Sequence, residues 1–280
     1  MSMSMCILGS GSRGNATLLT RDTSAGTRHA LIDCGLSRRE TNRRLSTLGL
    51  TIECISDILV THCDRDHFDA GWSQFALKHN ATIHMHRRQR TRALREGLDG
   101  RVLNMFEDRF TLDEETTVNS VLFAHDSLGT TGFVIEHDGR RLGFATDLGS
   151  VPSHIFEHFI GLHGIAFESN YDPQMQRDSD RPDFLKQRIM GGRGHLSNEQ
   201  ALRALRVIAG QSELSQIALL HLSQQCNDPA IIRALYEREA PELADRLTIT
   251  SQTTPSPMLE IMRIAPDAGH TTSGEQLAMF

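Results

Sequence analysis

Short apolar runs separated by polar turns recur along the chain and predict a protein rich in β-strands. The predicted strands cover residues 3–8, 30–35, 55–61, 82–86, 118–124, 132–137, 140–146, 165–167, 217–220 and 247–250. Helices are predicted at 37–48, 70–79, 87–96, 152–158, 197–208 and 228–239. In both halves the strands come first in clusters and then alternate with helices. This order indicates an α/β protein built as a layered sandwich.

Local turn and capping signals support several of these boundaries. Ser37 and Ser197 each precede a Glu or Gln by three residues, which is the capping-box pattern at the start of a helix. Asp138-Gly139 separates two apolar runs and predicts a tight β-hairpin. We therefore expect a single domain over residues 1–265, followed by a small polar tail at 266–280 that we expect to be flexible.

Composition limits the environment in which the protein works. The chain has 280 residues, 39% of them hydrophobic, which is enough for a real core and excludes a disordered protein. No apolar run approaches the roughly 18 residues of a membrane span, and the start shows no signal peptide. The five cysteines are scattered without a C-x-x-C pair, which is typical of a reducing compartment. We expect a cytoplasmic protein without a membrane partner.

The charge and the histidine content of the chain indicate which kinds of ligand it could bind. The formal net charge is −6, so no global basic field draws the protein to nucleic acid. Arginines nevertheless cluster at 87–95, where they could track phosphates or form an ordinary solvated face. Basic residues also cluster at 177–193, where they could steer a polyanion locally. The chain also holds 14 histidines, the commonest metal ligands among side chains.

Seven of the candidate metal ligands fall at or after the ends of predicted strands. One polar loop packs four of them into six residues: His62, Asp64, Asp66 and His67. Three more follow later strands directly: His125, Asp147 and His221. Each of these three alone is more often a loop or capping residue, and the loop alone could be a solvated turn. Together they suffice for two metal sites that share a bridging carboxylate and keep positions open for water.

This pattern resembles that of the metallo-β-lactamase-fold hydrolase superfamily, whose signature is H-x-H-x-D-H after a strand. Within it the chain is most similar to the YycJ/WalJ group of single-domain proteins, which are assigned as 5′→3′ DNA exonucleases. The resemblance covers residues 3–250 and rests on the signature and on the segments 9–16, 144–149, 168–170, 194–198 and 221–223. It implies a four-layer αββα metallo-β-lactamase-type sandwich that binds two divalent metal ions.

The resemblance also implies how the ligands are shared. One ion is held by His62, Asp64 and His125, the other by Asp66, His67 and His221, and Asp147 bridges them. The chain departs from the signature at Asp64, where the family has a second histidine. A carboxylate there favours manganese or iron over zinc. The alternative is that the Asp64 side chain is too short to reach, which leaves the first site weak or empty.

The implied chemistry is hydrolysis of a phosphodiester by a hydroxide shared between the ions. By similarity to tRNase Z, His195 is the expected general acid and Glu168 orients it, and Asp66 is counted with them as catalytic. The alternative for His195 is a capping role at the following helix. The residues expected to bind substrate are Ser197, Ser223 and Asn170.

A glycine-rich loop offers a competing interpretation. Gly9-x-Gly11-x-x-Gly14 matches a dinucleotide-binding fingerprint. However, residues 15–20 are strand-like and 24–26 form a turn, so no crossover helix fits before the next strand. We predict a hairpin instead, with Asn15 and Asp33 supporting the metal-site loops.

We therefore expect a metal-dependent phosphodiesterase, and specifically a nuclease with DNA as its partner. Two other classes stay open. Asp64 is compatible with a diiron or other redox protein on this fold, although no flavin-binding part follows. A hydrolase of small esters or lactones, or a metal-binding protein without turnover, is the other alternative. The sequence does not indicate the oligomeric state.

Overall fold

Two β-sheets form the centre of the structure, a computed structural model that describes residues 1–125 and 127–263. The first sheet contains β1 (Met3–Gly9), β2 (Ala16–Thr23), β3 (Gly26–Ile32), β4 (Ile55–Val60), β5 (Thr82–His86), β6 (Leu103–Phe106) and β14 (Leu259–Glu260). The second contains β7 (Arg109–Asp113), β8 (Thr116–Phe123), β9 (Thr130–His137), β10 (Arg140–Ala145), β11 (Gly164–Glu168), β12 (Gln216–Leu220) and β13 (Leu247–Ile249). The strand orders are β14-β1-β2-β3-β4-β5-β6 and β13-β12-β11-β10-β9-β8-β7.

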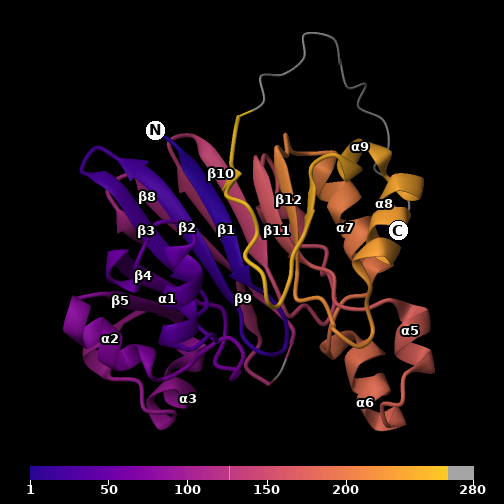
Figure 1. The fold of residues 1–280 in the computed structure, drawn as a ribbon, viewed down its shortest axis with the longest axis horizontal. Coiled ribbons are helices and arrows are strands. Elements are labelled where there is room, and N and C mark those ends of the chain that lie inside the picture. The colour runs from indigo at the N-terminus through magenta and orange to yellow at the C-terminus, as the bar shows by residue number, and fades with distance from the viewer. Residues whose placement is uncertain (126, 264–280) are drawn as a thin grey trace.

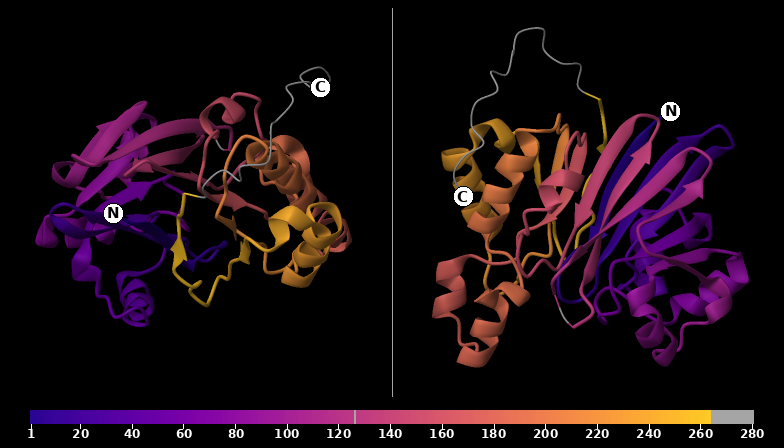
Figure 2. Two further views of the ribbon diagram at one scale, coloured as in Figure 1. Left: turned by 90° about the horizontal axis from the view of Figure 1, so that it is seen from above. Right: turned by 180° about the vertical axis from the view of Figure 1, so that it is seen from behind.

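Helices lie outside both sheets (Figures 1 and 2). The first sheet is covered by α1 (Arg38–Ser46), α2 (Trp72–His79) and α3 (Arg90–Arg95). The second is accompanied by α4 (Ile155–His158), α7 (Asn198–Ala209), α8 (Pro229–Glu239) and α9 (Pro241–Ala244). Two further helices, α5 (Pro173–Asp178) and α6 (Asp183–Arg188), lie apart from these layers. The described part of the chain has no helix with the length and apolar character needed to cross a membrane.

Three separate apolar cores confirm the four-layer αββα prediction. Met5, Phe133 and Ala218 belong to the core between the two sheets. Trp72 and Leu45 belong to a second core, in which the first sheet meets its helices. A third core joins the second sheet to α7 and α8 through residues such as Leu205, Ile217 and Ile232. Three cores require four layers, because each core fills one gap between neighbouring layers.

Each sheet contains both antiparallel and parallel strand pairs, and the parallel strands position the site. The strands β3, β4, β5 and β6 pair in parallel, as do β10, β11, β12 and β13. The carboxyl ends of parallel strands meet at one edge of a sheet, where loops carry functional side chains on a rigid support. The residues that follow β4, β10 and β12 therefore meet at the edge that Figure 1 shows at the bottom.

Most predicted elements are found, with informative exceptions. The hairpin after Gly14 is confirmed as β2 and β3, and Asp138-Gly139 forms the turn between β9 and β10 with positive φ at both residues. The helix predicted at 87–96 is interrupted: a short turn η2 (Arg87–Gln89) precedes α3. Gln89 is buried there and donates to the Gly129 carbonyl, which ties this turn to a distant loop. The tail predicted at 266–280 lies outside the described residues.

Candidate metal centre

Strained backbone turns carry three of the polar side chains at the strand ends. Asp33, Asp147 and His221 follow β3, β10 and β12, and their φ angles are 62°, 56° and 57°. This left-handed conformation costs an ordinary residue about 1–2 kcal/mol, and aspartate tolerates it better than most. All three side chains are buried. Such conformations concentrate at functional sites, where the surrounding structure holds the strain.

The loop between β4 and α2 is fixed by backbone contacts. The Asn15 N–H donates to the Asp66 carbonyl at 2.7 Å, and the Cys34 N–H donates to the His67 carbonyl at 2.9 Å. Gly35 passes so close that a Cβ there would lie 1.8 Å from the Asp66 carbonyl oxygen. Only glycine permits this approach. The loop therefore holds His62, Asp66 and His67 in set positions.

The Gly35 contact gives a stability prediction. We expect Gly35→Ala to destabilise the protein by about 2–3 kcal/mol, because a methyl group must displace backbone that is hydrogen-bonded on both sides. The melting temperature measured by circular dichroism should fall by roughly 4–10 °C. Gly100→Ala is the matched control, since a Cβ at Gly100 meets nothing within 4 Å. Equal melting temperatures for the two variants would show that the loop can shift freely.

The structure brings all seven predicted metal ligands together in two groups. One potential ligand atom from each member lies within 4.8 Å of the others in the same group. The first group is His62, Asp64 and His125, and the second is Asp66, His67 and His221. Asp147 lies between them, with carboxylate oxygens 2.8 Å from His67 Nε2 and 3.9 Å from His125 Nε2. Two further groups share these residues, one of His62, His67 and Asp147 and one of Asp147, Glu168, His195 and His221, so the assignment of ligands to particular ions stays a prediction.

Three of the histidine rings are oriented by hydrogen bonds on the side of the ring that faces away from the cluster. His67 Nδ1 lies 2.7 Å from Asp33 Oδ2, which leaves Nε2 facing Asp147. The Thr61 hydroxyl donates to Asp33, so its oxygen can accept the Nδ1–H of His62, which lies 3.0 Å away. His125 Nδ1 lies 3.1 Å from the Gly194 carbonyl. In each case Nε2 points into the cluster, as in metal sites whose ligand histidines donate their other N–H outward.

The buried ring nitrogens of the histidines indicate whether the cluster fits a cation. His62 Nε2 is buried and makes no hydrogen bond among the described residues, and the two ring nitrogens of His221 make none of good geometry, although Asp147 Oδ1 lies 3.1 Å from Nδ1 and Asp66 Oδ2 lies 3.4 Å from Nε2. Buried polar atoms are rarely left unpaired in native proteins. Imidazole nitrogens grouped with carboxylate oxygens are ligands for zinc, manganese or iron. The donor set therefore fits divalent metal.

The electrostatics of the cluster also favour added positive charge. Complete burial disfavours a charged His67 ring, yet the carboxylates of Asp147 and Asp33 outweigh it and raise the pKa of His67 well above its usual value. Burial likewise opposes a charged His221, and Asp147 again raises its pKa well above the usual value. The carboxylates thus attract a cation at these nitrogens, which a proton or a metal ion can supply.

Asp64 reaches the first group and contacts an arginine that the sequence did not connect to it. Its Oδ2 lies 3.7 Å from His62 Nε2 and 3.9 Å from His125 Nε2, while Oδ1 pairs with Arg92 at 2.7 Å. The His62 ring and the Arg92 guanidinium hold the pKa of Asp64 well below its usual value despite partial burial. The run of arginines at 87–95 signalled a basic helix, but no sequence pattern revealed this contact.

His195 and Glu168 form a pair beside the two groups. His195 Nδ1 lies 2.7 Å from Glu168 Oε1. The other oxygen, Oε2, accepts the backbone N–H groups of Leu148 at 2.6 Å and Leu196 at 3.3 Å. Glu168 is completely buried, whereas the His195 side chain is 21% exposed. Glu168 is therefore fixed as an anion that holds the imidazole, and Nε2 of His195 is left for other contacts.

A cleft of about 440 Å³ opens over this cluster. Asn170 and Ser223 line it, and Asn170 Nδ2 also donates to the His221 carbonyl at 2.6 Å. Ser197 is placed at the N-cap of α7, where its hydroxyl donates to Glu199 and accepts the Gln200 N–H. The predicted capping box is thus formed, and a role for Ser197 in binding substrate stays a prediction.

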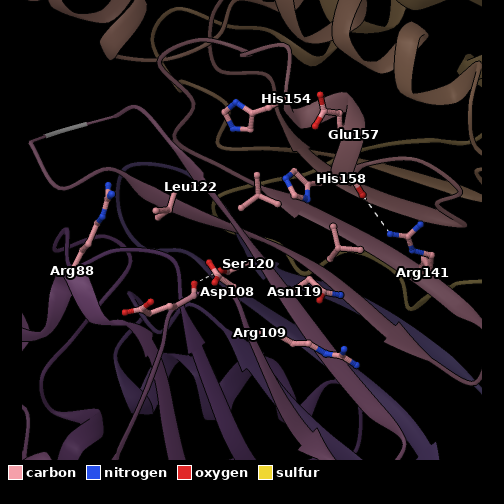
Figure 3. A pocket seen from close by; sticks show the side chains of 13 residues that line it. Arg88, Asp108, Arg109, Asn119, Ser120, Leu122, Arg141, His154, Glu157 and His158 are labelled. Carbon is pink, nitrogen blue, oxygen red and sulfur yellow. Dashed lines mark hydrogen bonds between the residues drawn. The ribbon is translucent and has the colours of Figure 1, made fainter.

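A larger hollow lies elsewhere and lacks this chemistry. It measures about 740 Å³ and lies over β8, where Asn119 and Leu122 line it together with His154 and His158 from the α4 region (Figure 3). Arg141 closes one end and donates to the His158 carbonyl. None of the seven clustered residues lines it. The smaller cleft is therefore the candidate active site.

Comparison with known proteins supports the resemblance seen in the sequence. The family model described as "Beta-lactamase superfamily domain" matches residues 28–220. Exodeoxyribonuclease YycJ of Bacillus anthracis is 29% identical over 238 residues, which are 83% of this chain and 87% of that protein.

Solved structures share the fold. The metallo-beta-lactamase fold protein YhfI of Bacillus subtilis superposes with a TM-score of 0.64 at 15% identity, covering 91% of this chain and 99% of that chain. The short form of human tRNase Z gives a TM-score of 0.60 at 16% identity, covering 91% and 98%. With the family model matching more than half of the sequence, the chain belongs to the beta-lactamase superfamily and has the metallo-β-lactamase fold.

Proposed function

We propose that this protein is a metal-dependent phosphodiesterase that degrades DNA as a 5′→3′ exonuclease. The observation that carries the proposal is the His195–Glu168 pair, 2.7 Å apart, at the edge of a cleft that also holds two groups of metal-ligand side chains. A placed proton donor suits a phosphodiester, because its leaving alkoxide must be protonated. The similarity to a protein named exodeoxyribonuclease supports DNA as the substrate.

The proposed ligand sets follow the two groups. His62, Asp64 and His125 would hold one divalent ion, Asp66, His67 and His221 the other, and Asp147 would contact both. Two such ions, when bound, supply Lewis acidity that activates water and stabilises charge on a phosphoryl oxygen. Asp66 would serve as a catalytic residue through this contact. Zinc, manganese and iron are all candidates.

The other residues would act on the substrate directly or, in the case of Glu168, through His195. His195 would donate a proton from Nε2 to the leaving oxygen, while Glu168 accepts the Nδ1–H and keeps the ring turned toward the cleft. Asn170 and Ser223 line the cleft and would donate hydrogen bonds to phosphate oxygens, with Ser197 as a third candidate. A cytoplasmic location agrees with the five cysteines, none of which forms a disulfide.

Metal analysis combined with two substrates tests this function. Protein purified without added metal should take up about two equivalents of manganese or zinc. The loaded protein should hydrolyse bis-p-nitrophenyl phosphate and 5′-phosphorylated duplex DNA, and a chelator should abolish both activities. Less than one equivalent in folded protein would contradict the two-metal proposal. Oxygen consumption by iron-loaded protein that leaves both phosphodiesters intact would favour the redox alternative instead.

A substitution at Asp64 tests metal preference. We expect Asp64→His to raise the ratio of activity with zinc to activity with manganese by about tenfold, because imidazole suits zinc and carboxylate suits manganese. The ratio is measured with bis-p-nitrophenyl phosphate under saturating concentrations of each metal. Asp69→His, in the same segment but outside the two groups, is the control. An unchanged ratio would mean that Asp64 does not contact the bound metal.

A further inference from the structure

Residues 172–194 form an arm beside the cleft, made of α5, α6 and the irregular turn η4 (Ile189–Arg193). In Figure 1 both helices lie below α7 and α8, on the side where the strands that carry the site end. We propose that this arm binds an unpaired DNA strand next to the bond that is cut, with three arginines on its phosphates and Phe184 stacked on a base. The inference rests on the proposed nuclease function and specifies its substrate.

The arginines of the arm face the cleft. The charged side chains of the arm that line it are Arg181, Arg188 and Arg193. Arg181 is held by neutral acceptors: it donates to Gln225 Oε1 at 3.1 Å, to Gln176 Oε1 at 3.0 Å and to Ser223 Oγ at 3.3 Å. Arg188 and Arg193 are exposed and form no ion pair within the described ranges. These charges are therefore available for phosphates.

A small apolar cluster joins the arm to Tyr171 and Cys226 outside it, so these positions are set before substrate arrives. Buried Tyr171, Ile189 and Cys226 pack together, with Met175, Leu185 and Met190 against them. Lys186 donates to the Arg177 carbonyl at 2.7 Å, which ties α6 back to α5. Leu185 and Ile189 belong to this core and also line the cleft. A preformed surface loses less entropy on binding than a mobile loop.

Phe184 is the unusual side chain of the arm. It is 71% exposed, and among the aromatic residues in the described parts of the chain it alone is exposed. It lies on α6 four residues before Arg188, so the two side chains share one face of the helix. Its neighbour Leu185 lines the cleft. Since Arg188 on the same face lines the cleft, the Phe184 position is close to its rim.

An aromatic ring beside phosphate-binding arginines matches a single nucleic-acid strand. Unpaired bases stack on exposed aromatic side chains while basic side chains follow the backbone, and this mode tolerates any sequence. In an intact duplex each base is stacked inside the helix, so Phe184 would find a base only at an unpaired end. Charge complementarity therefore favours a DNA strand over an uncharged apolar partner.

The test measures binding and activity in the full-length protein. A fluorescein-labelled oligothymidylate with phosphorothioate linkages, which resist cleavage, is titrated into the metal-loaded protein and followed by anisotropy. Phe184→Ala should weaken binding on the order of tenfold, and Phe184→Trp should restore it. Arg188→Gln should lower the slope of log K against log salt by about 0.7, the value for one phosphate contact on a single strand. Ile231→Ala and Arg203→Gln, both at exposed sites outside the cleft, are the matched controls and should behave as the parent protein.

The outcomes separate this inference from the proposed function. With manganese, Phe184→Ala should lower the ratio of kcat/KM for the oligonucleotide to that for bis-p-nitrophenyl phosphate. If Phe184→Ala binds the oligonucleotide like Ile231→Ala while the parent degrades DNA, the arm proposal fails and the nuclease function stands. If the parent hydrolyses neither substrate, the proposed function fails. A parent dimer that Phe184→Ala converts to monomer, with DNA binding unchanged, would also overturn the proposal by assigning Phe184 to a second copy of the chain.

Discussion

Asp147→Asn is expected to lower the rate of bis-p-nitrophenyl phosphate hydrolysis by about a thousandfold and to reduce bound metal below one equivalent. Among the described residues, Asp147 is the one carboxylate with oxygens within 4 Å of histidine ring nitrogens from both proposed ligand groups. Asparagine keeps the shape and tolerates the left-handed backbone, whose φ is 56°. The substitution therefore removes charge without imposing new backbone strain.

A second aspartate, Asp138, provides a close control for the Asp147→Asn substitution. Asp138 also has a positive φ, 47°, but it lies in the β9–β10 turn and pairs with Arg140 and the amino terminus. Asp138→Asn should retain full activity and metal. Circular dichroism checks that both variants fold, and elemental analysis after dialysis gives the metal content. Asp147→Asn with more than a tenth of the parent activity and two bound ions would contradict the bridging role.

The loss of activity in His195→Ala is expected to depend on the leaving group of the substrate. Hydrolysis of a thymidine dinucleotide, which releases an alkoxide, should fall by about 10²–10⁴-fold, the usual contribution of a general acid. Hydrolysis of the p-nitrophenyl ester of thymidine 5′-phosphate should fall much less, since p-nitrophenolate leaves without a proton. The physical basis is the fixed imidazole, which Glu168 holds at 2.7 Å.

The comparison uses kcat for both substrates at saturating manganese. His158→Ala is the control, because its imidazole is exposed at the end of α4 and lies outside the cleft. Equal losses with the two substrates would assign His195 a role in structure or binding rather than in proton transfer.

The strand ends were predictable because polarity changes abruptly there. His62, Asp147 and His221 each follow a buried run, and the parallel pairing of neighbouring strands then brings such ends together. The four layers were predictable only through the family resemblance, since alternation of apolar positions does not say which sheet a strand joins. β6 and β7 escaped prediction because they are short and only partly buried.

The sequence marked 177–193 as a basic segment, but the helices of the arm and their contacts were beyond the sequence pattern. α5 and α6 have six residues each, too short for a clear helical period. Arg92 meets Asp64 only because α3 folds back against the loop after β4, and Arg181 meets Ser223 across 42 residues of chain. Contacts of this kind depend on tertiary packing, which a single sequence does not encode locally.

The division of the ligand groups between the two sheets has a consequence for the stability of the whole molecule. The loop from His62 to His67 follows β4 of the first sheet, while His125 and His221 follow β8 and β12 of the second. Each group takes members from both sheets, so a cation bound there acts as a cross-link between the halves of the sandwich. At a free metal concentration one hundred times Kd, one such site adds about 2.7 kcal/mol to the free energy of unfolding. Metal supply would therefore govern resistance to proteolysis as well as turnover.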